Sequence, residues 1–183
     1  MGPGNQDRVS PMLLRVLAGI ETGILGGSAM FGWLAISSVL DRHSAWIVPN
    51  LLGSTLSGRP VLQRSFGWTA VSGLGLHLFV AGLVGMLFGI FIGDSQNRLR
   101  VTLLGVITGL VWYYFSQILF WRKLGKLMVV YCPPRPMLLG HFLYGLVLAW
   151  FPSGLRSLRR NFQGLVAVPV KTGETPAAPD AVE

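Results

Sequence analysis

The stretch that decides the fold is Gly85-Met86-Leu87-Phe88-Gly89-Ile90-Phe91-Ile92-Gly93, in which every fourth residue is glycine. Residues spaced by four lie on one face of an α-helix, so these glycines leave a strip of bare backbone along it. In a membrane such strips let two helices approach closely, because lipid offers no hydrophobic drive between helices. The stretch therefore predicts a tightly packed transmembrane helix.

The same spacing recurs at Gly19, Gly23 and Gly27, and in a shorter copy at Gly105 and Gly109. Consecutive membrane spans run antiparallel, so all three sets are expected at the end of the bundle nearest the termini. There three helices would pack backbone to backbone. The spacing leaves open whether these predicted packing glycines pair within one chain or between copies.

The composition favours a membrane domain. Of 183 residues, 51% are hydrophobic and only 12% are charged, whereas soluble domains are about a quarter charged. A helical crossing needs roughly 20 apolar residues. We therefore predict an all-α, four-helix transmembrane bundle with glycine-zipper packing over residues 12–152. Its expected spans are about 12–40, 68–93, 99–121 and 137–151.

Four segments outside these spans have distinct characters. Residues 1–11 form a polar N-terminal lead, and residues 167–183 read as a disordered tail. Residues 46–52 are apolar but too short to span, which predicts an interfacial or re-entrant segment. Residues 153–166 predict a basic amphipathic helix on an anionic membrane surface. Its expected lipid headgroup contacts are Arg156, Arg159 and Arg160.

The formal net charge is +8. Because the basic residues lie at the ends of apolar spans, they indicate contact with lipid headgroups and not with nucleic acid. The Lys and Arg counts on the two sides of the four spans tie. The basic helix after the fourth span favours cytoplasmic termini, since the cytoplasmic leaflet is the anionic one.

Polar side chains collect in the half of the bundle away from the glycines, where they predict a pocket or wet cavity. The candidates are His77, His141, Tyr113, Tyr114, Gln117 and Tyr144. The two histidines lie on helices that run parallel, so they are also candidate axial ligands of a b-type haem. The alternative is that each histidine forms a hydrogen bond to a neighbouring helix or lies at the membrane interface. We expect no metal site and no other cofactor.

Glu21 is the only acidic residue well inside a predicted span. Intramembrane carboxylates often carry protons or bind cations, so Glu21 is a candidate proton or cation site. The alternative interpretation is structural: the carboxylate reaches the headgroups or pairs with Arg15, Arg98 or Arg100.

The helix His141-Phe-Leu-Tyr144-Gly145-Leu-Val-Leu and the loop Trp46…Pro49-Asn50-Leu51-Leu52-Gly53 resemble segments of uncharacterised bacterial multi-pass membrane proteins. The resemblance covers most of residues 12–152. It implies a bacterial inner membrane and no particular activity.

No nucleotide-binding, zinc-protease or serine-hydrolase motif occurs in the chain. We therefore expect a non-enzymatic protein, a small scaffold or accessory subunit that packs against other membrane subunits or itself. A small transporter or channel that uses Glu21 and a pocket at His77 and His141 is the alternative. A haem-carrying membrane anchor is a second alternative.

Overall fold

A computed structural model describes residues 10–57, 65–95, 97–118, 131 and 133–166. These residues form helices and turns, and no strand occurs among them. The helices are α1 (Pro11–Leu40), α2 (Ile47–Ser57), α3 (Trp68–Ile92), α4 (Arg98–Ser116), α7 (Pro134–Leu148) and α8 (Phe151–Val166). Most of the predicted polar lead, the end of the third predicted span and the predicted disordered tail lie outside the described residues.

Within the described residues, four helical stretches are long and apolar enough to cross a membrane. Three of them are α1, α3 and α4. The fourth runs from Pro134 to Gln163 and so joins α7 to most of α8. The prediction of an all-helical, multi-pass membrane protein is confirmed at this level by helix length and composition.

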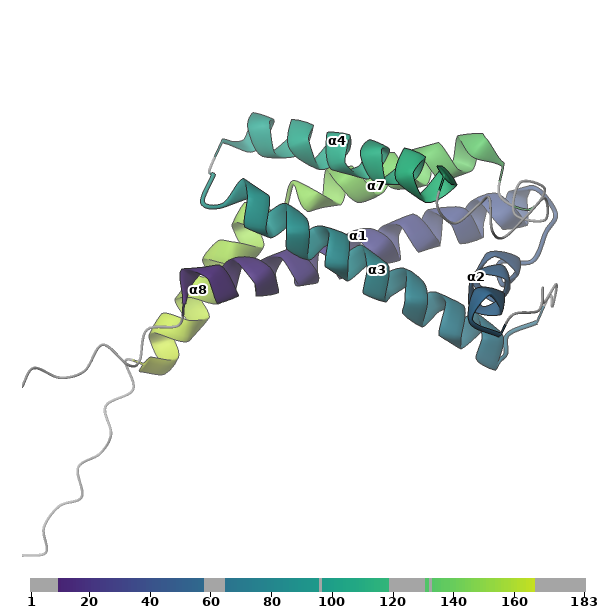
Figure 1. Cartoon of the computed structure of the whole chain (residues 1–183), viewed down its shortest axis with the longest axis horizontal. Helices are drawn as coiled ribbons and strands as arrows, with labels where there is room; N and C mark the ends of the chain where they lie inside the picture. The colour runs from purple at the N-terminus through teal and green to yellow at the C-terminus, as the bar shows by residue number, and fades with distance from the viewer. Residues whose placement is uncertain (1–9, 58–64, 96, 119–130, 132, 167–183) are drawn as a thin grey trace, which may run out of the picture.

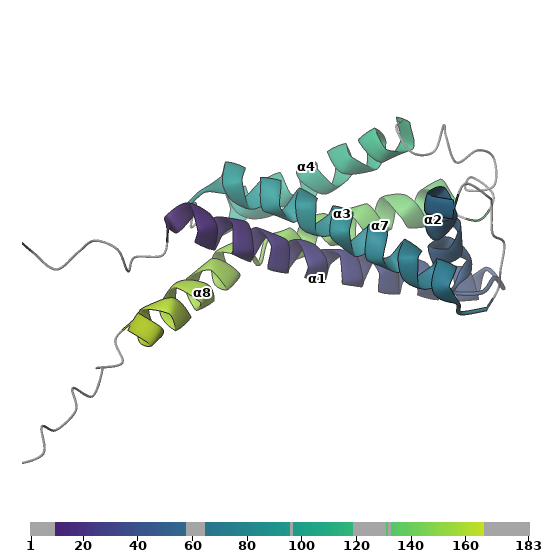
Figure 2. The ribbon, with the colours of Figure 1, turned by 60° about the horizontal axis from the view of Figure 1, so that its bottom comes forward.

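The long helices form two antiparallel pairs, α1 with α3 and α4 with α7 (Figure 1). Helix α7 also packs against α1, and this contact joins the two pairs. At one end of the bundle α1 begins and α8 leaves α7, as the turned view shows (Figure 2). At the opposite end the short helix α2 lies beside the start of α3. By contrast, α3 and α4 follow each other in the chain but barely touch.

The seam between α1 and α3 is made by glycine. A Cβ added at Gly85 would stand 2.6 Å from the Cα of Gly23, and one added at Gly89 would stand 2.6 Å from the carbonyl oxygen of Arg15. A Cβ at Gly23 would stand 2.5 Å from the carbonyl oxygen of Ala81. Two backbones can approach this closely only because no side chain separates them.

The seam between α4 and α7 is built in the same way. A Cβ on Gly105 would stand 2.5 Å from the carbonyl oxygen of Gly145, and a Cβ on Gly109 would collide with that of His141. The expectation that α1, α3 and α4 pack together backbone to backbone is therefore wrong for α4. The glycines of α4 face α7, because α1 already occupies the glycine face of α3.

Gly93 has a different role from the other predicted packing glycines. It caps the end of α3 with φ 61°, in the left-handed region that favours glycine. A Cβ there would have no heavy atom closer than the Arg15 guanidinium, 3.9 Å away. The helix therefore ends at Ile92 for a conformational reason, and the link to α4 begins there.

Helix α2 forms from the predicted interfacial or re-entrant segment. Its residues Ile47, Val48 and Leu51 are buried. A Cβ on Gly73 of α3 would stand 2.6 Å from the backbone nitrogen of Gly53, so α2 and α3 also meet without side chains between them. The apolar character of α2 is explained by this packing, since a helix of 11 residues is too short to span.

Helix α8 is only partly the surface helix that the sequence predicts. Phe151 and Leu155 are buried, and the ring of Phe151 lies edge-on to Phe88 at 6.0 Å. These residues anchor the first turns of α8 in the core. Leu158 and Phe162, further along, are partly buried against the core. Towards its C-terminal end α8 leans away from the bundle (Figure 2).

Candidate functional site

A partly open cavity of about 100 Å³ lies between helices α1, α2, α3, α4 and α7. Most of its wall is aliphatic. The polar side chains in its wall are Thr55, His77, Ser116, His141 and Tyr144, and Trp112 adds an indole. An apolar cavity of about 150 Å³ holds benzene, whereas drug-sized ligands need 300 Å³ or more. The cavity therefore suits a small molecule or one end of a larger one.

Two helix-to-helix hydrogen bonds cross this region. The hydroxyl of Tyr144 donates to the carbonyl oxygen of Ala81 at 2.8 Å, which ties α7 to α3. The Nε2 of His77 lies 2.9 Å from the carbonyl oxygen of Gly27, which ties α3 to α1. Because a carbonyl oxygen can only accept, the proton of this bond is on Nε2.

The other polar groups bond within their own helices. The Nδ1 of His141 donates to the carbonyl oxygen of Met137 at 2.8 Å. The hydroxyls of Ser116 and Thr55 donate to the carbonyls of Tyr113 and Leu52, at 2.8 and 2.7 Å. Backbone carbonyls thus engage the donors of Thr55, His77, Ser116, His141 and Tyr144, as burial in an apolar interior requires. The indole N–H of Trp112 has no hydrogen-bond partner among the described residues.

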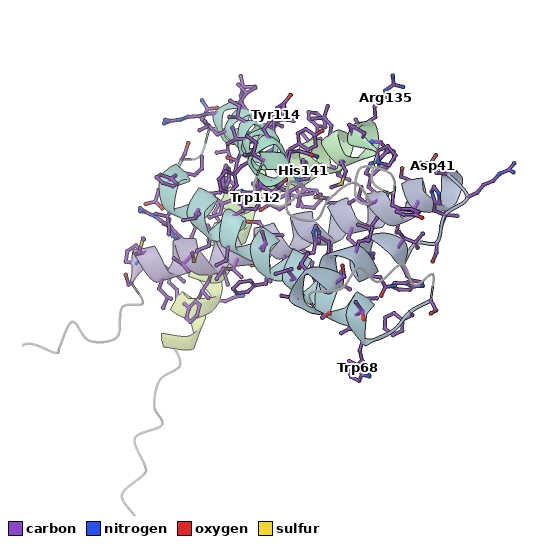
Figure 3. All side chains as sticks on the ribbon, turned by 45° about the vertical axis from the view of Figure 1, so that its right-hand side comes forward. Asp41, Trp68, Trp112, Tyr114, Arg135 and His141 are labelled. Carbon is purple, nitrogen blue, oxygen red and sulfur yellow. The ribbon has the colours of Figure 1, made fainter. Side chains whose placement is uncertain are left out.

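The structure brings together three of the predicted pocket residues, His77, His141 and Tyr144. Tyr113 does not line the cavity, but its ring lies edge-on to that of His141 at 5.3 Å. Tyr114 is 64% exposed and, like Gln117, is not part of the cavity wall. In Figure 3, Trp112 and His141 lie between α4 and the other helices, whereas Tyr114 lies on the outer side of α4.

Of the six cavity residues that carry a polar group, sequence reasoning missed three: Trp112, Ser116 and Thr55. Ser116 follows Tyr113 by three residues and so shares its face of α4, whereas Trp112 directly precedes Tyr113 and does not. A prediction based on the face of Tyr113 therefore cannot include both residues. Thr55 belongs to α2, and no spacing rule connects that helix to the cavity. Only the packing of α2 on α3 brings it there.

Glu21 does not belong to this site. It is exposed and does not line the cavity. Its carboxylate lies near Gly154 of α8, since a Cβ built there would stand 3.8 Å from Oε2. Along α1 it precedes Gly27, the partner of His77, by roughly 9 Å. Within the described residues Glu21 makes no ion pair, so its predicted pairing with Arg15, Arg98 or Arg100 is not seen.

Arg15 pairs instead with Asp94, in the link between α3 and α4, at 2.5 Å. Arg159 of α8 pairs with the second oxygen of the same carboxylate. The two guanidinium groups, Arg15 first, hold the pKa of the Asp94 carboxyl below its usual value. We call this cluster the Asp94 clasp. It engages Arg159, one of the three predicted headgroup contacts, while Arg156 bonds Ser153.

Among the described residues that line the cavity, none is Lys, Arg, Asp or Glu. Among the described residues no group of three His, Cys, Asp or Glu side chains is placed to hold a metal ion. What the cavity offers is apolar wall, two imidazole rings and hydroxyl oxygens. This set can accept hydrogen bonds but has no nucleophile paired with a base.

Comparisons with protein-family models, with curated proteins and with solved structures find no match to this chain.

Proposed function

We propose that this chain is a non-enzymatic membrane protein, a small scaffold or accessory subunit that packs against other membrane proteins or a second copy of itself. The observation that carries the proposal is an unoccupied small-residue face on α1. A Cβ added at Gly32 would meet nothing within 4 Å, and Ser28, one turn earlier, is exposed. Leu25 and Ile36 border them, at 49% and 58% exposed.

This face differs from the glycine seams inside the chain. Gly19, Gly23 and Gly85 are already in backbone contact within one molecule. Gly32 has no such contact, yet glycine in a helix interior costs roughly 0.5–1 kcal/mol relative to alanine. A small, bare centre between two large apolar residues is the kind of surface against which another transmembrane helix packs.

The experiment is native mass spectrometry of the protein extracted gently from its host's membranes. We expect an assembly larger than the monomer. In Gly32→Leu, which fills the bare face, the assembly should be lost while the monomer keeps its thermal midpoint. Gly32→Ala keeps the face small and is the matched control. A wild-type protein that is monomeric in native lipid nanodiscs would contradict the proposal.

We further propose a glycine zipper between α1 and α3 and an interfacial or re-entrant position for α2. The close α1–α3 contact supports the description of a glycine zipper, and the short buried α2 supports an interfacial or re-entrant segment. We also propose a bacterial inner membrane with cytoplasmic termini, supported by the basic helix α8. Reporter fusions at the C-terminus, active only in the cytoplasm or only outside it, test the orientation.

The transporter alternative has one observation in its favour, the cavity between the helices. It needs Glu21 and the histidines to act at separate places, because Glu21 does not line that cavity. If it holds, Glu21→Gln abolishes a pH-dependent flux in proteoliposomes and leaves the assembly intact. A flux that persists in Glu21→Gln removes this role for the carboxylate.

We propose no resident haem. A haem is far larger than a cavity of about 100 Å³, which is smaller than one that holds benzene. In addition, the Nε2 of His77 is engaged by Gly27. The absorption spectrum of the purified protein tests this: a Soret band that disappears in His77→Ala or His141→Ala would restore the haem anchor.

A further inference from the structure

The hydrogen bonds of the cavity define which groups are left to bind a ligand. His141 is 3% exposed and donates from Nδ1 to its own helix, so its neutral ring carries a lone pair on Nε2. His77 donates from Nε2, which leaves the lone pair on Nδ1. Neither of these remaining nitrogens has a hydrogen-bond partner among the described residues. The cavity therefore presents hydrogen-bond acceptors whose donors are missing.

The charge of the ligand follows from the same wall. Apart from the indole N–H of Trp112, the side-chain donors of the described cavity wall are engaged by backbone carbonyls. No Lys or Arg lies among the described lining residues, so an anion would be buried without a counter-charge. No carboxylate belongs to the described part of the cavity wall, so a cation would likewise be buried without a counter-charge. A neutral group with an O–H donor satisfies the acceptors without either cost.

The route of the rest of the ligand is set by helix packing. Leu76 and Val80 of α3 face Trp112 and Ser116 of α4 across the cavity. Because α3 and α4 barely touch, nothing in the described residues seals the wall between them as the glycine seams seal the others. An alkyl chain attached to the bound group can leave the cavity there and lie in hydrocarbon.

We propose that the cavity is a binding site for the hydroxyl head of a neutral aliphatic alcohol, held by the acceptor nitrogens of His141 and His77, with its alkyl chain between α3 and α4. The alcohol is either a free molecule or the headgroup of a neutral lipid such as a diacylglycerol. This site goes beyond the accessory role and does not depend on it.

The test uses octan-1-ol and its isomer heptyl methyl ether, which has the same formula and no O–H. Protein labelled with ¹⁵N-histidine is placed in lipid nanodiscs, where only three histidines contribute signals. Octan-1-ol should shift the resonance of an unprotonated ring nitrogen of His141 or His77 toward the hydrogen-bonded position, in a saturable way. Half-saturation by the ether should need about fivefold more compound and should leave that nitrogen unshifted.

Two variants locate the site. Val80→Phe places a ring in the cavity and should abolish the response to octan-1-ol. Val71→Phe is the same substitution on the same helix at a position outside the cavity wall, and should respond like the wild type. If Val80→Phe disturbs the histidine resonances before any alcohol is added, Leu76→Phe takes its place. A second titration with dioleoylglycerol in the nanodisc separates a lipid source from a free alcohol.

Three results would overturn the proposal. The first is an equal response to alcohol and ether, which would make the cavity merely apolar. The second is a response that rises linearly with the alcohol content of the lipid and never saturates. The third is a response that survives in Val80→Phe. None of these results bears on the assembly tested with Gly32→Leu, so each proposal can fail without the other.

Discussion

The helix pairs α1–α3 and α3–α4 pack in opposite ways: the first pair is in close backbone contact, and the second has almost no contact. α1 and α3 are separated in sequence by α2, yet their backbones meet directly at Gly23 and Gly85. α3 and α4 are joined by a short link, yet they barely touch. Connection along the chain therefore does not decide which helices pack.

Which helices pack closely depends on how many glycine-lined faces each helix has. α3 presents one glycine face along its second half and uses it on α1, while α4 presents one through Gly105 and Gly109 and uses it on α7. Gly73 of α3 packs on α2, and none of the described glycines of α3 or α4 contacts the other of these two helices. Leu76 of α3 and Trp112 of α4 instead line the cavity.

The sharpest test of this contrast is a pair of identical substitutions on α3. Gly85→Ala adds a Cβ that would stand 2.6 Å from the Cα of Gly23 and should cost about 1–3 kcal/mol by overpacking. Gly75→Ala adds one where nothing lies within 4 Å and should stabilise by about 0.5–1 kcal/mol. Unfolding in mixed detergent micelles, followed by circular dichroism, measures both. Equal effects would mean that the seam is not what holds α1 to α3.

The seams also show how far sequence reasoning reaches. The spans and the glycine faces can be predicted from sequence periodicity, because periodicity depends only on residues within one helix. Which glycine faces which helix is a tertiary property. Gly145, the partner of Gly105, is a lone glycine with no partner four residues away along its helix, so no repeat marks it. The prediction that α1, α3 and α4 share one glycine contact failed for this reason.

The candidate site divides in the same way. His77, His141 and Tyr144 could be predicted because polar groups inside apolar spans are costly and face protein. Glu21 belongs to the same class by sequence, but lies elsewhere, next to α8. The hydrogen bonds that fix the histidine tautomers run to Gly27 and Met137. Backbone partners have no sequence signature, so the acceptor character of the cavity could not be predicted.

A second pair of substitutions, with a smaller expected effect, compares a hydrogen bond between two helices with a hydrogen bond within one helix. Tyr144→Phe removes the bond from α7 to the carbonyl of Ala81 and should cost about 0.6–1 kcal/mol. Ser116→Ala removes a hydrogen bond to the carbonyl of Tyr113 in the same helix. It should lower the free energy of unfolding much less, because no hydrogen bond between helices is lost. The same unfolding measurement checks both. A larger loss in Ser116→Ala would show that the cavity wall, not the bond to α3, controls stability.

The smallest expected effect concerns the Asp94 clasp, which joins the link between α3 and α4 to the start of α1 and to α8. Asp94 is half-exposed, so water screens its ion pairs and Asp94→Asn should barely change global stability. It should instead raise amide hydrogen exchange in the part of α8 beyond Leu155, where Leu158 and Phe162 pack against the core but are only partly buried. Asp41→Asn, at the opposite end of the bundle, is the matched control.

The pH dependence of the clasp follows from the lowered pKa of the Asp94 carboxyl. A lowered pKa means that the folded state holds the charged form, so the stabilisation is complete above the ordinary pKa of a carboxyl group. It is lost as the pH falls through the lower value of the folded state. Hydrogen exchange in α8, corrected for the intrinsic pH dependence of amide exchange, should therefore rise on acidification in the wild type and in Asp41→Asn. It should stay constant in Asp94→Asn, where α8 is released at every pH. If acid loosened α8 equally in Asp94→Asn, another carboxyl group would hold it, and Glu21, which lies beside Gly154, would be the next to replace.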